Sequence, residues 1–355
     1  MQCAIFYCIN YSQAAEEGVT MPTTKRIAKW DNLKLFLIFT VVEGHIADIF
    51  YEYCNDMKSV FFFIYLFHMP AFIFLSGLFS KKTVDGNNYK KVLPYVTLYF
   101  ATLFLRFVSS AVCYGTDSLP LFDSSGVPWF VFSLFLMNII TMYTKKFKPQ
   151  WVLAASIILS IFAGYNYQNI DAFSIMRTIN YYPFFYLGYI LDRGKLNEFL
   201  SRKKIKIISA VFIAAVFAVC FLIPKDIMFL RTFVTGRGIY STLGDIAVWG
   251  GLIKIPVTAV TLALIMALIS LTPSKEFKLS VLGSRTLGVY VVHYCFIDIL
   301  FAIKPVTPAM VDMPAVLRQI IVLALSAVIT LICSNKYFDA ALKKIMDHGA
   351  KLKEK

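Results

Sequence analysis

Residues 59–79 have the sequence SVFFFIYLFHMPAFIFLSGLF. This stretch contains no Asp, Glu, Lys or Arg, and it is long enough to cross a bilayer as a helix, which takes about 20 apolar residues. Hydrophobic residues make up 58% of the 355-residue chain, well above the share in soluble globular domains. The sequence therefore predicts an all-α, polytopic integral membrane protein without a separate soluble domain.

Further apolar stretches bring the expected number of transmembrane helices to about ten. The other ranges are roughly 33–52, 92–113, 128–143, 151–165, 178–192, 205–223, 246–271, 285–303 and 316–334. The breaks between the fourth and seventh spans are the least distinct, so nine or eleven spans remain alternatives. Basic residues recur in every second loop, as the positive-inside rule requires. We therefore expect a multi-pass protein of the cell membrane with both termini in the cytoplasm.

The chain divides into three expected regions. Residues 1–24 are expected to form a disordered N-terminal extension, with Met21 as an alternative translation start. Residues 25–334 form the membrane domain, and residues 335–355 form a basic amphipathic tail on the cytoplasmic face. The stretch 224–245 mixes aromatic, basic and glycine residues. It is expected either to lie along the outer membrane surface or to form a lid.

Charge and cysteine content exclude several classes. The net charge of +14 is spread over short loops, which indicates contact with the lipid bilayer and no nucleic-acid partner. The seven cysteines form no CxxC pair and no metal-ligand spacing. We expect neither a disulfide framework nor a metal site. The oligomeric state is not indicated by any of these features.

Three histidines lie inside apolar stretches, namely His45, His68 and His293. Counted along their helices at about 1.5 Å per residue, the three rings come to a similar depth in the bilayer. An ionisable ring inside a membrane is costly and usually functional, and histidine exchanges protons near neutral pH. A structural hydrogen bond to a neighbouring helix is the competing interpretation for any one of them. Together they predict a buried acid–base site.

Charged residues near the histidines are candidates for the same site. Lys34 precedes His45 by eleven residues, so the two share a helix face about 16 Å apart. Asp48 follows His45 by three residues and would orient its imidazole, unless it is a solvated carboxylate at the interface. Lys34 is either a ligand or a topology anchor. Arg106 and Lys254 either extend to an interface or line a cavity.

Two local features concern the second span. Pro70 follows His68 and is expected to loosen the helix there, because proline lacks a backbone N–H. Ser76 and Gly77 are small, so they are expected to let this helix approach a neighbour closely.

Six blocks of sequence occur in an order that resembles a known family. They are WDNLKLFLIFTVVEGH, FHMPAFIFLSGLF, YKKVLPYVTLYF, PWFVFSLFL, YYPFFYLGYIL and GSRTLGVYVVHY. This ordered set resembles the acyltransferase-3 family of membrane O-acyltransferases, in particular its fucose 4-O-acetylase-like branch. The resemblance covers about residues 30–334. It implies a membrane acyltransferase domain of about ten spans that moves acetyl groups from cytoplasmic acetyl-CoA to hydroxyls of cell-surface sugars.

The resemblance also assigns residues. His45 matches the essential histidine of the first span, and Lys34 stands where the family has an arginine, so a bidentate phosphate contact is lost there. Lys90, Lys91 and Tyr95 match the basic cluster before Pro-x-Tyr, although lysines replace arginines and Tyr follows Pro directly. His68 matches the His-Met-Pro of the fucose-acetylase branch. His293 matches a histidine late in the chain.

Acyl transfer to an alcohol needs a base and a donor that stabilises the oxyanion. We expect His45 to be the base or a transient acetyl carrier, with Asp48 orienting it and His68 or His293 stabilising the oxyanion or positioning the acceptor. We expect Lys34, Lys90, Lys91, Tyr95 and Arg106 to bind acyl-CoA. The alternative function is a proton-coupled small-molecule transporter, since buried histidines also form proton relays. The acyl group, acetyl or another small one, and the acceptor sugar stay open.

Overall fold

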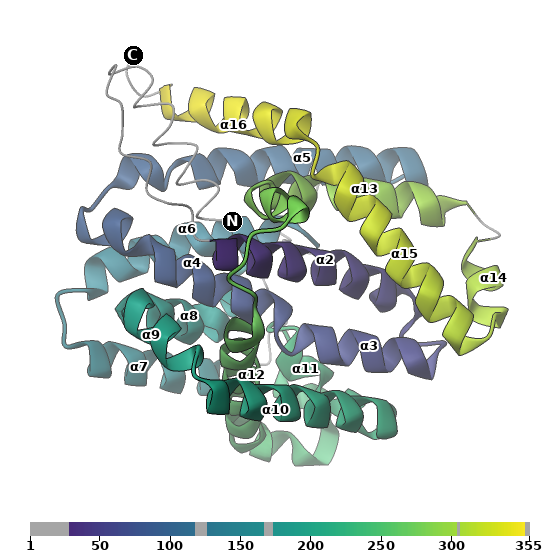
Figure 1. The fold of residues 1–355 in the computed structure, drawn as a ribbon, viewed down its shortest axis with the longest axis horizontal. Coiled ribbons are helices and arrows are strands. Elements are labelled where there is room, and N and C mark those ends of the chain that lie inside the picture. Colours follow the sequence, from purple (N-terminus) through teal and green to yellow (C-terminus); the bar gives the residue numbers. More distant parts are fainter. Residues whose placement is uncertain (1–27, 118–125, 167–172, 304–305, 352–355) are drawn as a thin grey trace.

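The computed structural model describes residues 28–117, 126–166, 173–303 and 306–351. Within these ranges the chain is helical and contains no strand (Figure 1). The expected extension 1–24 lies outside the described residues. The α-helices are α2 (Ala28–Phe50), α3 (Asn55–Tyr65), α4 (His68–Asp85), α5 (Pro94–Tyr114), α6 (Pro128–Thr144), α7 (Pro149–Ala163), α8 (Ile175–Ile190), α9 (Arg193–Leu200), α10 (Lys203–Leu222), α11 (Arg231–Val234), α12 (Gly250–Leu271), α13 (Thr286–Ala302), α14 (Val306–Asp312), α15 (Ala315–Cys333) and α16 (Lys336–Lys351). Short 3₁₀ helices are η1 (Tyr89–Lys91), η2 (Asp226–Leu230), η3 (Tyr240–Trp249) and η4 (Lys278–Ser284).

Several helices are long and apolar enough to cross a membrane. Among the described residues there are five such segments, Asn55–Asp85, Tyr89–Tyr114, Lys203–Leu222, Tyr240–Leu271 and Ala315–Cys333. A sixth is counted if η4 and α13, which meet at 83°, form one bent span. The protein is thus an all-α, multi-pass membrane protein. Each of the ten predicted spans overlaps helical residues, the second one covering both α3 and α4, and the number that crosses the bilayer stays a prediction.

The outward faces of the peripheral helices are apolar. On α5, Phe100, Phe104, Val108 and Val112 follow one another at four-residue spacing, and all four side chains are exposed. Residues four apart share a helix face, so these side chains form one stripe. Similar exposed aliphatic residues occur on α7, α10 and α15. In water such surfaces would be unfavourable, whereas lipid tails cover them at no cost.

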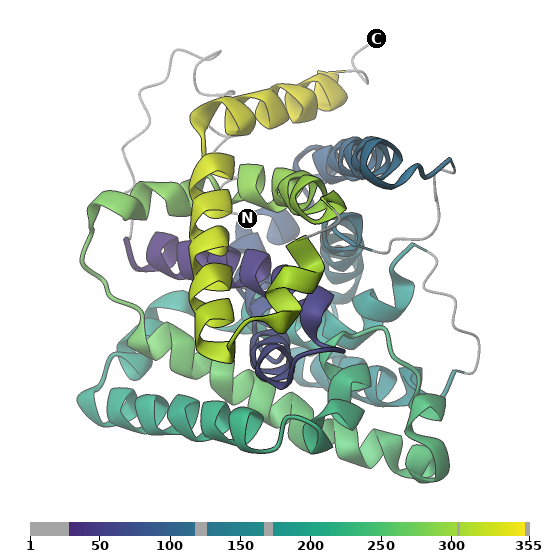
Figure 2. The same cartoon turned by 90° about the vertical axis from the view of Figure 1, so that its right-hand side faces the viewer.

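α2 lies in the middle of the bundle and is covered by protein (Figures 1 and 2). It packs against α3, α4, α13, α15 and η4. Most of its residues are buried, including the charged residues Lys29, Asp31 and Lys34. Lys29 donates a 2.8 Å hydrogen bond to Asn197 Oδ1. Such polar groups are tolerated within membrane depth when they face the bundle interior.

The second predicted span is interrupted in its middle. α3 ends at Tyr65 and α4 begins at His68, and Phe67 has φ −129° and ψ −31° between them. Pro70 occupies the third position of α4, where its missing N–H leaves one carbonyl of the preceding turn without its helical donor. This interruption confirms the expected loosening near Pro70. It gives His68 a backbone setting that a continuous helix would not provide.

α4 and α8 approach each other through two glycines. A Cβ added to Gly77 would overlap the carbonyl oxygen of Phe185, and one added to Gly188 would overlap that of Phe74. The expectation that Gly77 permits a close helix–helix approach is therefore confirmed. This contact fixes α8 beside α4.

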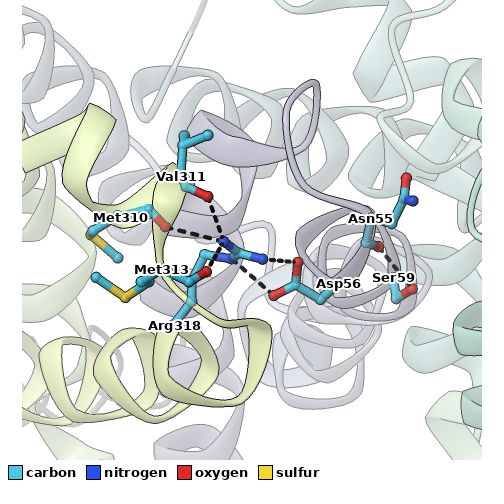
Figure 3. A network of polar contacts seen from close by, with 7 residues as sticks. All are labelled: Asn55, Asp56, Ser59, Met310, Val311, Met313 and Arg318. Atoms are coloured by element: carbon cyan, nitrogen blue, oxygen red, sulfur yellow. Dashed lines mark hydrogen bonds and ion pairs between the residues drawn. The ribbon is translucent and has the colours of Figure 1, made fainter.

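Arg318 of α15 connects three elements (Figure 3). Its Nε and Nη2 donate to the two carboxylate oxygens of Asp56 in α3, at 3.0 and 2.6 Å. Its Nη1 donates to the backbone oxygens of Met310, Val311 and Met313 at 3.0–3.1 Å. The guanidinium thus satisfies the carbonyls at the end of α14 and holds α3 in place.

The C-terminal helix α16 packs on α5 and α13 (Figure 1). Leu342 and Met346 are buried, while Lys336 and Lys344 are exposed. An amphipathic helix therefore occupies most of the expected tail, and residues 352–355 lie outside the described residues. Its position on the cytoplasmic face stays a prediction.

Candidate functional site

The imidazoles of His45 and His293 are stacked. Their ring centroids lie 5.3 Å apart with an interplanar angle of 28°. The ring of Tyr294, the next residue on α13, packs edge-on against His45 at 4.9 Å. α2 and α13 pack against each other, which brings these rings together from distant parts of the sequence.

Tyr65 connects His45 to His68. Its hydroxyl lies 3.5 Å from His45 Nδ1, and its ring packs against His68 with centroids 4.7 Å apart. Tyr65 is the last residue of α3 and His68 the first of α4. The interruption of the second span therefore places both side chains beside the first span. The three histidines predicted from the sequence form one cluster.

Two of the histidines have their tautomer fixed by the backbone. His68 Nδ1 lies 2.8 Å from the carbonyl oxygen of Ile64, and His293 Nδ1 lies 2.8 Å from that of Val289. A carbonyl oxygen only accepts, so Nδ1 must carry the proton in both rings. Each neutral ring then has its lone pair on Nε2. His293 Nε2 is buried and has no hydrogen-bond partner among the described residues.

An ion pair supports the far side of the cluster. Arg106 of α5 binds Asp298 of α13, and Ser109 Oγ donates to the same carboxylate at 2.6 Å. The guanidinium of Arg106 lies over the ring of Tyr294, 4.3 Å from its centroid. Arg106 thus holds Tyr294 from one side while His45 contacts it from the other.

A cavity of about 110 Å³ opens beside the cluster. Its lining residues come from α2, α3, α4, α6, α8, α11 and α13 and include His45, Asp48, Tyr65, His68 and Tyr294. Trp129, Arg177, Tyr181, Arg231, Arg237 and Tyr290 also line it. Although three histidines lie close together, the described residues contain no group of three or more His, Cys, Asp or Glu that could hold a metal ion.

One wall of the cavity is a segment that we call the strap, residues 226–239. It contains η2 and α11 and connects α10 to η3. Tyr181 of α8 donates to the carbonyl oxygen of Val234 at 3.0 Å, and Asn180 Nδ2 donates to that of Gly236 at 2.6 Å. Gly236 has φ +69°, and a Cβ there would meet the Tyr181 ring. The stretch expected as a surface segment or lid is therefore fastened to α8.

Asp48 interacts with the strap. Its carboxylate lies 3.4 Å from Arg231 Nη2, and within the described residues it makes no hydrogen bond to His45. The Arg231 guanidinium lies over the rings of Tyr51 and Phe61, 4.6 and 5.3 Å from their centroids.

The structure brings some sequence-predicted residues together and separates others. His45, His68 and Asp48 line the cavity, and His293 stacks on His45. Arg106 belongs to the same cluster. The other predicted acyl-CoA residues, Lys34, Lys90, Lys91 and Tyr95, are not among the cavity-lining residues.

These four residues lie in the N-terminal third of α2, in η1 and at the start of α5. Lys34 is buried and pairs with Asp31 at 2.7 Å. Lys90 and Lys91 lie in η1, where Lys90 is exposed and Lys91 is half-buried. Tyr95 is buried at the start of α5. Lys254, which was expected either at an interface or at a cavity, lines a different, smaller cavity of about 20 Å³. Its amino group donates hydrogen bonds to the backbone oxygen of Ser160 and to Asn180 Oδ1.

The sequence argument did not single out Tyr65, Tyr294, Arg177, Arg231 and Arg237. Two of them had a signal, because Tyr65 and Tyr294 lie within three residues of a singled-out histidine. The arginines come from α8 and the strap, and only the assembled bundle places them at the cavity.

A model of the acyltransferase-3 family, described as an acyltransferase domain, matches residues 27–335. The chain belongs to the acyltransferase-3 family. The match spans α2 to α15, and thus includes the histidine cluster, the cavity and the strap. The membership agrees with the resemblance carried by the six sequence blocks and with the apolar helices of a multi-pass membrane protein.

Two curated relatives of this acyltransferase-3 protein carry the name nodulation protein NolL. The protein from Mesorhizobium japonicum is 28% identical over 220 residues, which cover 56% of this chain and 57% of the relative. The protein from Sinorhizobium fredii is 25% identical over 214 residues, covering 54% and 56%. The chain thus matches little more than half the length of these relatives. No solved structure matches it.

Proposed function

We propose that this protein is a membrane O-acyltransferase that moves an acetyl or other small acyl group from cytoplasmic acyl-CoA to a hydroxyl of a cell-surface or lipid-linked sugar. The observation that carries the proposal is the stack of His45 and His293 beside a cavity lined by His68. A group of imidazoles inside a membrane bundle suits proton transfer during acyl transfer. The family membership supports the same reaction class.

His45 is the general base in this proposal. A ring nitrogen takes the proton of the acceptor hydroxyl while the hydroxyl oxygen forms a bond to the thioester carbonyl carbon. The carbon–sulfur bond then breaks, and His45 returns the proton to the leaving sulfur, so that coenzyme A departs as a thiol. No external oxidant or metal is required.

His68 positions the acceptor. Because Nδ1 of His68 donates to the Ile64 carbonyl, the neutral ring presents only a lone pair at Nε2. It therefore accepts a hydrogen bond from a hydroxyl and cannot donate one to an oxyanion. The hydroxyls of Tyr65 and Tyr294, both in the cavity lining, are the donors suited to oxyanion stabilisation.

The acyl-CoA phosphates bind at the opposite end of α2 in this proposal. Lys90, which is exposed, and Lys91 are the basic residues of η1 that would contact the phosphates, and Lys34 pairs with Asp31 in α2. The positive-inside pattern assigns this end to the cytoplasm, together with both termini, in a protein of the cell membrane. The thioester then has to cover the distance of about 16 Å between Lys34 and His45.

The test is loss of surface acylation when His45 is replaced. Cells that express wild-type protein, His45→Ala or His45→Gln at equal membrane levels are compared by mass spectrometry of their surface glycans. We expect both variants to lower acylation by about 10²–10⁴-fold, the usual contribution of a general base. The matched control is His348→Ala, the fourth histidine of the chain, which lies in α16. Near-wild-type acylation by His45→Ala would overturn the proposal.

A binding measurement separates this function from transport. Coenzyme A should raise the unfolding temperature of the purified wild-type protein, because a ligand that binds only the folded state stabilises it. The absence of any shift at millimolar coenzyme A would favour the transporter alternative.

A further inference from the structure

Lys254 is a buried cation of α12 that contacts neutral oxygens. Its amino group donates to the backbone oxygen of Ser160 in α7 and to Asn180 Oδ1 in α8. It forms no ion pair with the residues that the structure describes. A buried cation without a carboxylate partner is costly, and charged groups at membrane depth are usually functional. The hydrogen bonds of Lys254 are therefore expected to serve a purpose beyond packing.

The lysine determines which way the amide of Asn180 faces. An ammonium group has donors only, so the amide atom beside it must be the carbonyl oxygen. The amide nitrogen Nδ2 then points to the strap and donates to the carbonyl oxygen of Gly236 at 2.6 Å. A reversed amide would set donor against donor at Lys254 and acceptor against acceptor at Gly236. Lys254, Asn180 and Gly236 thus form one chain of hydrogen bonds with a fixed direction.

The end of this chain lies in the wall of the histidine cavity. Gly236 stands between Thr235 and Arg237, and both of these residues line the cavity of about 110 Å³. Tyr181 holds Val234 with its own hydroxyl at 3.0 Å. The bond to Gly236 is therefore the part of the attachment to α8 that depends on Lys254.

The strap also separates the two cavities. Val234 lines both the histidine cavity and the smaller cavity of about 20 Å³ beside Lys254, and Tyr65 and Tyr181 line both as well. At Val234 the two cavities are thus divided by that side chain itself. The smaller cavity offers space into which the strap can move. A shift of the strap would therefore change the shape of the histidine cavity directly.

We propose that Lys254 is a positioning residue of the acyl-transfer site. It fixes the amide of Asn180, the amide holds the strap at Gly236, and the strap shapes the acceptor side of the histidine cavity. The inference rests on the proposed function, since it concerns the wall of the same site. Lys254 is not among the residues that line the histidine cavity, so it acts through Asn180 and the strap and not by touching a substrate.

The first experiment measures hydrogen–deuterium exchange of strap peptides in the purified full-length protein. Lys254→Met keeps a side chain of similar length and removes every N–H donor. We expect the amides of residues 231–239 to exchange at least about fivefold faster in this variant, the factor that loss of one hydrogen bond implies for local opening. Lys254→Gln retains an N–H donor and should give a smaller increase.

Asn180→Asp separates the strap from the contact between α8 and α12. A carboxylate at this position still accepts from Lys254, but it has no hydrogen to donate to Gly236. The strap should therefore exchange faster, while the unfolding temperature stays at or above that of Lys254→Met. The matched control is Thr261→Val. Thr261 is buried, lines the same small cavity and makes no side-chain hydrogen bond with the described residues, so strap exchange should stay unchanged.

The second experiment tests whether the position of the strap matters for the reaction. Surface-glycan acylation is compared in cells that express wild-type protein, Lys254→Met or Thr261→Val at equal membrane levels. We expect Lys254→Met to lower acylation by about tenfold or more, because a displaced wall misplaces the acceptor, and Thr261→Val to retain it. The coenzyme A concentration that gives half of the maximal rise in unfolding temperature should stay the same in both variants.

Three results would overturn the proposal: unchanged strap exchange in Lys254→Met, an equal increase in exchange throughout the protein, and faster strap exchange with full acylation. The second result would show that Lys254 only stabilises the fold, and the third that the strap does not position the acceptor. If the wild-type protein acylates no glycan, the proposed function fails, whereas the exchange data still show whether Lys254 holds the strap. The two failures are thereby distinguishable.

Discussion

His293 lies ring against ring with His45 at a centroid distance of 5.3 Å, and its Nε2 is buried without a partner among the described residues. A buried nitrogen without a hydrogen bond costs free energy. We therefore propose that this lone pair accepts a hydrogen bond when substrates are bound, so that His293 acts as a positioning residue for His45 or for the acceptor.

His293→Phe tests this role. Phenylalanine keeps an aromatic ring against His45 but removes both nitrogens. We expect the acyl-transfer rate to fall by about tenfold or more, while the unfolding temperature changes by only a few degrees, because no large cavity is created. Acyl transfer and thermal unfolding are measured on the same preparation. An acyl-transfer rate equal to that of the wild type would show that the His293 ring contributes only packing.

The pair formed by Arg106 and Asp298 should be strongly coupled. Asp298 is 3% exposed, so Arg106→Ala leaves a buried carboxylate without its cation and should cost about 3–5 kcal/mol of stability. The double variant Arg106→Ala with Asp298→Ala should recover part of that loss, which a double-mutant cycle measures by chemical unfolding. Additive losses would contradict the coupling. Acyl transfer should fall in the single variant as well, because Tyr294 loses the guanidinium that supports it.

Gly77→Ala should separate α4 from α8. The added Cβ would overlap the carbonyl oxygen of Phe185, and backbone atoms in two packed helices cannot move apart cheaply. We expect a destabilisation of about 1–3 kcal/mol, as overpacking usually gives. Gly194→Ala in the exposed helix α9 is the control and should be neutral or slightly stabilising, since alanine favours helices. Thermal unfolding of both variants measures the difference, and equal stability of the two would contradict the close contact of α4 with α8.

Arg318→Lys tests the network of Figure 3. Lysine keeps the charge, but its single amino group cannot donate hydrogen bonds to both Asp56 and the three carbonyl oxygens. We expect a loss of about 2 kcal/mol or more in stability, with acyl transfer at low temperature unchanged because Arg318 does not line the cavity. Arg202→Lys is the matched surface control. Equal stability of the two variants would show that the network contributes nothing.

Helix positions were largely predictable, since a membrane span is recorded locally in an apolar stretch of about 20 residues. The first span, 33–52, agrees with α2, and the last, 316–334, agrees with α15. The histidine cluster followed from depth counting along each helix. Depth alone, however, does not fix which faces meet, so the stack of His45 on His293 required the packed bundle.

Other parts of the site depend on contacts between distant segments. Asp48 was expected at His45 because the two share a helix face, but the strap brings Arg231 closer to it. Arg106 was expected at acyl-CoA because its charge is unusual within a span, and the bundle places Asp298 beside it. In both cases the deciding partner comes from another helix, which single-helix geometry does not contain. Binding of acyl-CoA by Lys34, Lys90, Lys91 and Tyr95 stays a prediction.

The backbone carbonyls of Ile64 and Val289 choose the tautomers of His68 and His293 from within their own helices. The orientation of these two lone pairs thus does not depend on the side chains around the cavity. Under the proposed function, replacing residues of the strap, which line the cavity, is expected to change which acceptor binds while leaving these two tautomers as they are. An engineer who wishes to redirect this scaffold to a new alcohol can therefore vary residues 226–239 and leave the histidines untouched.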